Sequence, residues 1–241
     1  MQLTDFSVLT FDCYGTLIDW ESGIASALQP LLIRAGQTLT RDVVLATFSE
    51  LETQLERAHP AMRYSELLAV VHDALARAWG VTPDVAESRR FGASVGDWPA
   101  IADTVASLRY LQKHYKLVIL SNVDRDSFRA SNARLGVVFD AVYTAEDVGS
   151  YKPDPRNFTY LIEHLAAMGI DRSAVLHTAQ SLFHDHAPAN DVGLASAWID
   201  RRHDVGGWGA TAAPPADVHY DFRFTSLAEM VDAHRAALGG G

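Results

Sequence analysis

Cysteine is nearly absent from this sequence. The one cysteine, Cys13, excludes a disulfide within the chain, and such sparing use is typical of a reducing compartment, so we expect a cytoplasmic protein. Residues 1–12 lack the basic start and the apolar run of a secretory signal peptide. No stretch of the sequence approaches the roughly 20 apolar residues that span a bilayer, and we expect no membrane partner.

The sequence also lacks an excess of basic over acidic residues. Lys and Arg together number 20 and Asp and Glu number 30, so the net charge is −10 with histidine neutral. A negatively charged chain binds polyphosphate poorly, and we expect no nucleic-acid partner. A small anionic substrate is still compatible with this charge, because one local pocket can oppose the global field. With 48% hydrophobic residues, the chain has the composition of a globular protein.

Short apolar runs alternate with helix-length amphipathic segments. Runs without polar alternation are typical of strands that are buried on both faces, as in a parallel sheet. The amphipathic segments at 104–115 and 158–168 repeat their apolar residues at helical spacing. The alternation predicts an α/β fold with a three-layer, doubly wound parallel sheet. The predicted strands are 6–11, 116–120, 141–144, 174–178 and 195–199.

One long segment breaks this alternation. Residues 20–95 contain no convincing strand, only helical patterns such as those at 41–57 and 64–79. This is far longer than a crossover helix needs, so we expect an all-helical cap inserted into a core made of residues 1–19 and 96–241. Ligands of open α/β sheets bind beyond the carboxyl ends of the strands, so the cap is expected to cover the site.

Polar side chains follow four of the predicted strands. Asp12 follows the first, Ser121 and Asn122 the second, Lys152 comes after the third, and Asp185 after the fourth. A single Asp at such a place most often caps a turn. Four polar strand ends at one edge of a sheet are harder to explain by packing, and they indicate a functional site.

These motifs resemble a known family over essentially the whole chain. The segment 11–17 (FDCYGTL), the Ser-Asn pair, the segment 151–155 (YKPDP) and the late Asp185 are together similar to the haloacid dehalogenase superfamily. The DCYGTL form resembles its type II 2-haloacid dehalogenase branch. Within that branch, residues 177–203 are similar to the L-azetidine-2-carboxylate hydrolases. The resemblance implies a Rossmann-like core, a helical cap and an aspartyl-ester intermediate.

Metal-dependent phosphatases of the same superfamily are the main alternative. The resemblance implies that those enzymes need a second Asp two residues after the nucleophile and an acid early in the last motif. Tyr14 and Gln180 stand at these positions here. Tyrosine, with a pKa near 10, is a poor general acid, and Mg²⁺ is usually held through carboxylates. We therefore expect no metal and no cofactor. A non-catalytic binding protein on the same fold is the third alternative.

The reaction implied by the resemblance assigns five residues to catalysis. Asp12 is expected to be the nucleophile and Lys152 to keep it ionised through Coulomb attraction. Ser121 lies at the neighbouring strand end. Asp185, with His184, is expected to position or deprotonate the hydrolytic water.

Four further residues are expected to hold a small carboxylic acid substrate or to shape its site. Asn122, together with Ser121 and the backbone near Tyr14, is expected to bind the substrate carboxylate. Thr16 is expected to orient Asp12 or its ester. Trp20, where the cap begins, is either a pocket wall or hinge packing.

Departures from the halide-binding pattern favour a different leaving group. The family resemblance implies an arginine in the first part of the cap, but residues 50–56 (ELETQLE) contain none, and Phe158 replaces a tyrosine. A departing halide needs a cationic or N–H environment, whereas Glu50 or Glu52 favours a cationic group such as a ring ammonium. We therefore expect opening of an azetidine ring rather than halide release. A helical cap also offers a surface for a homodimer.

Overall fold

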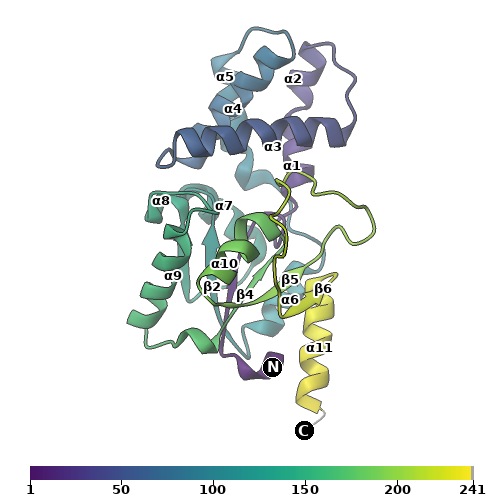
Figure 1. Cartoon of the computed structure of the whole chain (residues 1–241). Helices are drawn as coiled ribbons and strands as arrows, with labels where there is room; N and C mark the ends of the chain where they lie inside the picture. Colours follow the sequence, from purple (N-terminus) through teal and green to yellow (C-terminus); the bar gives the residue numbers. More distant parts are fainter. Residues whose placement is uncertain (240–241) are drawn as a thin grey trace.

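A six-stranded parallel sheet lies at the centre of the computed structural model, which describes residues 1–239 (Figure 1). The strand order is β3-β2-β1-β4-β5-β6. The predicted doubly wound α/β fold is confirmed, and the five predicted strands agree with the observed ones to within two residues. The strands are β1 (Val8–Phe11), β2 (Lys116–Ser121), β3 (Ala141–Thr144), β4 (Val175–Ala179), β5 (Ala195–Ile199) and β6 (Phe222–Phe224).

Helices cover both faces of this sheet. Successive residues of a strand point to opposite faces, so each strand packs against both layers of helices. Leu9 and Ile119 belong to one apolar cluster, whereas Val8 and Val118 belong to a second cluster on the other face. Each strand therefore needs continuous apolar sequence. The first cluster contains side chains of α6 (Thr104–Leu111), α7 (Arg125–Leu135) and α11 (Leu227–Gly239); the second contains those of α9 (Arg156–Ala167) and α10 (Ala187–Asp191).

Strand β6 was not predicted from the sequence. It is three residues long and has the exposed Arg223 at its centre. It pairs only with β5, at the edge of the sheet, so it does not need the apolar run that identifies a central strand. The loop 200–221 that precedes it includes the Gly-, Ala- and Pro-rich stretch predicted as a loop.

The chain between β1 and β2 begins with five helices that stand over the carboxyl ends of the strands (Figure 1). In α4, Leu67, Leu68, Val71 and Leu75 recur at helical spacing and are buried. No helix within residues 1–239 is long and apolar enough to cross a membrane. The five are α1 (Trp20–Ala27), α2 (Gln29–Arg34), α3 (Arg41–Ala58), α4 (Tyr64–Ala78) and α5 (Val85–Gly92).

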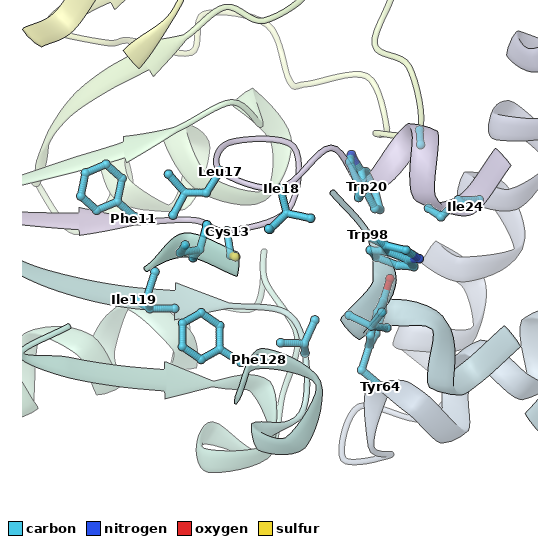
Figure 2. Close-up of a cluster of buried hydrophobic side chains, with 14 of the residues drawn as sticks. Phe11, Cys13, Leu17, Ile18, Trp20, Ile24, Tyr64, Trp98, Ile119 and Phe128 are labelled. Carbon is cyan, nitrogen blue, oxygen red and sulfur yellow. The ribbon is translucent and has the colours of Figure 1, made fainter. Parts of the chain in front are cut away.

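The apolar cluster of the sheet continues into these helices (Figure 2). Figure 2 shows Phe11 and Ile119 at the sheet end and Trp98 with Ile24 at the helical end. Gly23 of α1 makes this contact possible, because a Cβ there would lie 2.3 Å from ring atoms of Trp98. The helical insertion and the sheet therefore share one hydrophobic core.

Asp124 joins the helical insertion to the sheet by capping two helices. Its Oδ1 accepts from Ser127 N in the first turn of α7, and its Oδ2 accepts from Ser65 N in the first turn of α4, both at 2.9 Å. We expect Asp124→Ala to lower the free energy of unfolding by about 2 kcal/mol in urea denaturation, since one cap is worth about 1 kcal/mol. The matched control is Asp126→Ala, which removes a more exposed acid nearby. An equal decrease in the free energy of unfolding for both variants would contradict the double cap.

This contribution of Asp124 should depend on pH. Burial raises the pKa of its carboxyl, but the N–H groups of Ser127 and Ser65 lower it more, so the net direction is downward. A carboxyl with a depressed folded-state pKa stabilises the protein above its unfolded pKa of about 4, and that stability is lost as the pH falls through the folded value. The difference between wild type and Asp124→Ala should therefore shrink below about pH 4.

Candidate active site

The carboxyl ends of three adjacent strands form the centre of the site. Because β1 pairs with both β2 and β4, the residues that follow these strands meet at one edge. Asp12 follows β1, Asn122 follows β2, and Asp185 lies in a π-helical turn (Leu182–His186) after β4. Lys152 reaches the same place from the segment that follows α8 (Ala145–Val148).

Asp12 is held by one cation and one hydroxyl. Its Oδ1 accepts from Lys152 Nζ at 2.9 Å, and its Oδ2 accepts from Thr16 Oγ1 at 2.8 Å. Gln180 N donates to the same Thr16 oxygen at 2.9 Å, so the hydroxyl hydrogen of Thr16 is free to point to Asp12. Thr16 is therefore positioned to orient the carboxylate.

A tight turn brings Thr16 back to Asp12. Gly15 has a φ of +92°, a conformation that glycine adopts without strain. A Cβ at this position would also lie 3.1 Å from both Gln180 Oε1 and Trp20 Nε1. The glycine of the FDCYGTL motif thus combines an unusual backbone angle with close contact to two neighbours.

Lys152 uses all three of its donors inside the protein. Only 1% of the residue is exposed, and Nζ donates to Asp12 Oδ1, to Asp185 Oδ1 at 2.6 Å and to Leu120 O at 2.9 Å. Burial alone would lower the pKa of Lys152, but the two carboxylates raise it above its ordinary value. The side chain is therefore a fixed ammonium between the two acids.

Asn122 fixes the backbone of Lys152. Its Nδ2 donates to Lys152 O at 3.0 Å, and its Oδ1 accepts from Lys152 N at 2.6 Å. Because both ends of the amide are engaged, the contact that Asn122 offers to a substrate carboxylate is limited in this conformation. Ser121, at the end of β2, lies deeper: its Oγ is buried and has no hydrogen-bond partner within residues 1–239.

The two acids differ in their ionisation. Burial raises the pKa of Asp12, although Lys152 and Thr16 oppose this effect. Burial also acts on Asp185, but Lys152 and His177 outweigh it, and the pKa of Asp185 is lowered well below its ordinary value. Asp185, which is fully buried, is therefore the fixed anion of the pair, and Asp12, which is 6% exposed, is the more basic carboxylate.

His177 supports Asp185 and was not identified as a site residue from the sequence. Its Nε2 lies 3.0 Å from Asp185 Oδ1, and its Nδ1 lies 2.8 Å from Thr10 Oγ1. A proton on Nε2 that is donated to Asp185 agrees with Nδ1 accepting from Thr10. The signal in the sequence is a histidine within the mostly apolar, fully buried strand β4. The second oxygen of Asp185, Oδ2, is buried and has no hydrogen-bond partner among the described residues.

His184 is a neutral neighbour of these acids. Burial lowers its pKa to about 4, so it is unprotonated at neutral pH. Ser181 Oγ accepts from His184 N at 2.9 Å and lies 3.2 Å from His184 Nδ1, which orients the ring. A neutral imidazole beside Asp185 fits a role in positioning water rather than in binding an anion.

A cavity of about 40 Å³ lies between these groups and the helical insertion. This is room for roughly three water molecules, at about 10–15 Å³ for each. Both Tyr14 and Trp20 line the cavity, and Trp20 also belongs to the apolar core cluster, so it takes part in both of the environments considered for it. Its lining is Asp12, Tyr14, Trp20, Glu52, Glu56, Tyr64, Asn122, Val123, Lys152, Gln180, Ser181, His184, Asp185 and Thr211.

Two acids of α3 reach this cavity, and the sequence had indicated only one of them. Glu50 is exposed, whereas Glu52 and Glu56 are buried in the cavity wall. The four-residue spacing from the buried Phe48 places Glu52 and Glu56 on the same face of the helix. Helical periodicity was therefore the signal that distinguishes these acids from Glu50.

The donor set does not fit Mg²⁺. The ammonium of Lys152 contacts Oδ1 of both Asp12 and Asp185, and the neutral Tyr14 and Gln180 supply no further carboxylate. Over residues 1–239, no group of three or more His, Cys, Asp or Glu is arranged to hold a metal ion. Magnesium needs near-octahedral oxygen coordination, usually with carboxylates.

Comparison with known proteins gives a consistent result. The sequence model of a family described as haloacid dehalogenase-like hydrolase matches residues 6–178. An (S)-2-haloacid dehalogenase of Pseudomonas putida is 26% identical over 228 residues, which cover 92% of this chain and 93% of the relative. A protein of the same name from Pseudomonas fluorescens is 27% identical over 226 residues, with 91% and 92% covered.

A solved structure shares the fold. It is an L-2-haloacid dehalogenase from Xanthobacter autotrophicus with chloropropionic acid covalently bound. The TM-score is 0.78 at 19% identity, and the match covers 98% of this chain and 100% of that chain. The helical insertion is therefore part of the shared architecture.

Proposed function

Because the chain belongs to the haloacid dehalogenase-like hydrolases, we propose that it hydrolyses a small 2-substituted carboxylic acid through an ester of Asp12. The observation that carries this proposal is the position of Asp12 in the cavity wall. There its carboxylate accepts from Thr16 and is paired with the ammonium of Lys152. All three N–H donors of that ammonium are used by Asp12, Asp185 and Leu120. The chloropropionic acid bound covalently in the Xanthobacter structure supports the same type of chemistry.

In the first step, an oxygen of Asp12 attacks C2 of the substrate and the leaving group departs with the bonding electrons. Forming an ester of Asp12 first, and hydrolysing it afterwards, replaces one difficult displacement by two easier steps. Burial supports the attack, because a poorly solvated carboxylate has no water shell to shed. No metal takes part in the proposed reaction.

In the second step, water attacks the carboxyl carbon of the Asp12 ester and releases a 2-hydroxy acid. Asp185 is the residue proposed to hold this water, because its buried Oδ2 is the oxygen that Lys152 and His177 leave free. The neutral ring of His184 assists from the same turn. The oxygen of that water remains in the carboxylate of Asp12, which makes the route measurable.

Among possible leaving groups, the cavity favours a ring nitrogen, as in L-azetidine-2-carboxylate, over a halide. None of the described side chains that line it is an arginine, and its one cation, Lys152, already donates to Asp12, Asp185 and Leu120. A departing halide anion would therefore meet few donors. The buried acids of α3, Glu52 and Glu56, offer it no positive charge. Strain in a four-membered ring assists the departure of the nitrogen.

The test is a single turnover in H₂¹⁸O with excess enzyme, using L-azetidine-2-carboxylate and L-2-chloropropionate in parallel. We expect ¹⁸O in the peptide that contains Asp12 and faster ring opening than chloride release. Label in the product alone would contradict the ester route, and faster chloride release would reverse the preference for nitrogen. Hydrolysis of p-nitrophenyl phosphate only after Mg²⁺ is added would overturn the proposed function.

A further inference from the structure

Two carboxyl groups of α3 face the active-site cavity from the side opposite Asp12. Glu52 and Glu56 are one helical turn apart, 5% and 7% exposed, and both line the cavity. Buried acids are rare in proteins unless they are paired. The cap therefore brings two further acids into a pocket that already contains Asp12 and Asp185.

The two glutamates differ in their partners. Glu52 Oε1 accepts from Tyr64 Oη at 2.6 Å. Glu56 is 7% exposed and makes no hydrogen bond or ion pair with any residue that the structure describes, but its oxygens are not among the fully buried atoms without a partner, so they open to the cavity that Glu56 lines. Leaving a carboxyl group buried without a partner is unfavourable. Glu56 thus points to a ligand that supplies the missing donor.

Glu56 also stands where a substrate would pass. An adjoining cleft of about 350 Å³ is lined by Glu56, Lys152 and His184, and the same three residues line the inner cavity. A molecule that enters from this cleft passes these side chains on its way to Asp12, whereas a second cleft of about 230 Å³ adjoins the cavity at Trp20 and Gln180. The position gives Glu56 direct access to the substrate.

We propose that Glu56, with Glu52 beside it, binds the positively charged nitrogen of a 2-amino acid substrate and so selects cationic over halide leaving groups. This inference builds on the proposed function. The substrate carboxylate and its nitrogen are attached to the same carbon, so a nitrogen held against α3 leaves the opposite face of C2 open to Asp12. In-line attack requires that arrangement.

The ionisation of the pair agrees with this role. Burial raises the pKa of Glu52 to about 8, and burial together with Glu52 raises that of Glu56 well above its ordinary value. Lys152 already donates to Asp12, Asp185 and Leu120, so the two glutamates repel each other as anions when no cationic ligand is bound beside them. A cation beside them favours the charged form and restores the attraction. An anionic leaving group gains nothing from the pair.

Equilibrium binding separates this role from catalysis. L-Proline and cyclopentanecarboxylate have the same ring size and carboxylate, but only proline carries a ring ammonium. By calorimetry, we expect wild type to bind L-proline at least tenfold more tightly than cyclopentanecarboxylate. Glu56→Gln should reduce this preference to less than threefold, and the matched control Glu50→Gln, on the exposed side of α3, should keep it. No preference in wild type, or an unchanged preference in Glu56→Gln, would overturn the proposal.

Turnover gives a second readout. In Glu56→Gln, we expect kcat/KM for L-azetidine-2-carboxylate to fall at least tenfold, mainly through a higher KM, and that for L-2-chloropropionate to change less than threefold. An equal loss for both substrates would assign Glu56 a structural role and contradict the inference. If wild type hydrolyses neither substrate, the proposed function fails, whereas the binding preference for L-proline still decides the role of Glu56.

Discussion

Replacing Asp12 by Asn should lower kcat by about six orders of magnitude, the scale on which removal of a covalent nucleophile acts. The amide has nearly the same shape but lacks the charge that attacks saturated carbon. We expect this variant to fold for two reasons. Lys152 keeps Asp185 as its partner, and the substitution removes the carboxyl of Asp12, whose ionisation is disfavoured by burial, as its raised pKa indicates. The measurement is steady-state turnover of L-azetidine-2-carboxylate, with urea denaturation as the control for folding.

Replacing Asp185 by Asn should stop the reaction after the ester of Asp12 has formed, rather than before it. In Asp185→Asn the nucleophile remains, but the anion that holds the hydrolytic water is lost. We expect one equivalent of substrate to react per active site and to remain attached, giving a stable increase in protein mass that maps to the peptide containing Asp12. No such adduct should form in Asp12→Asn. Full activity of Asp12→Asn, or an adduct on another residue, would exclude the ester route.

The sheet and the acids around Asp12 were predictable because both depend on local patterns. Parallel strands buried on two faces require uninterrupted apolar residues, and the chain repeats such runs between amphipathic helices. Parallel pairing then brings every carboxyl strand end to the same edge, so Asp12, Lys152 and Asp185 converge without further information. Strand β6 lacks this signal, since an edge strand of three residues needs no apolar run.

Other features of the site depend on packing between distant segments. Helical spacing places Glu52 and Glu56 on the buried face of α3, but it does not say that this face lies opposite Asp12. The pairing of β1 with β4 places Thr10 beside His177, and this neighbour fixes the ring that supports Asp185. Such contacts join residues far apart in the sequence, and no local pattern encodes them.

Lys152→Met should produce the largest loss of stability. The substitution keeps much of the volume and removes the ammonium, so Asp12 and Asp185 are left as two buried acids without the cation between them. Breaking a buried ion pair from one side typically costs about 3–5 kcal/mol, and we expect a loss of that size in urea denaturation at pH 7. Lys113→Met, which removes an exposed lysine, should change the stability by less than about 0.5 kcal/mol.

The pH dependence of this loss distinguishes electrostatics from packing. In wild type, the raised pKa of Lys152 means that its contribution is fully present below the unfolded pKa of about 10.4 and is lost as the pH rises through the folded value. Without the ammonium, the folded pKa values of Asp12 and Asp185 rise above the unfolded value of about 4. The variant therefore regains stability as the pH falls through those raised values, and its deficit relative to wild type should shrink towards pH 4. A deficit that stays constant from pH 9 to pH 4 would show that Lys152 acts through its volume, and Asp12 would then not depend on its charge.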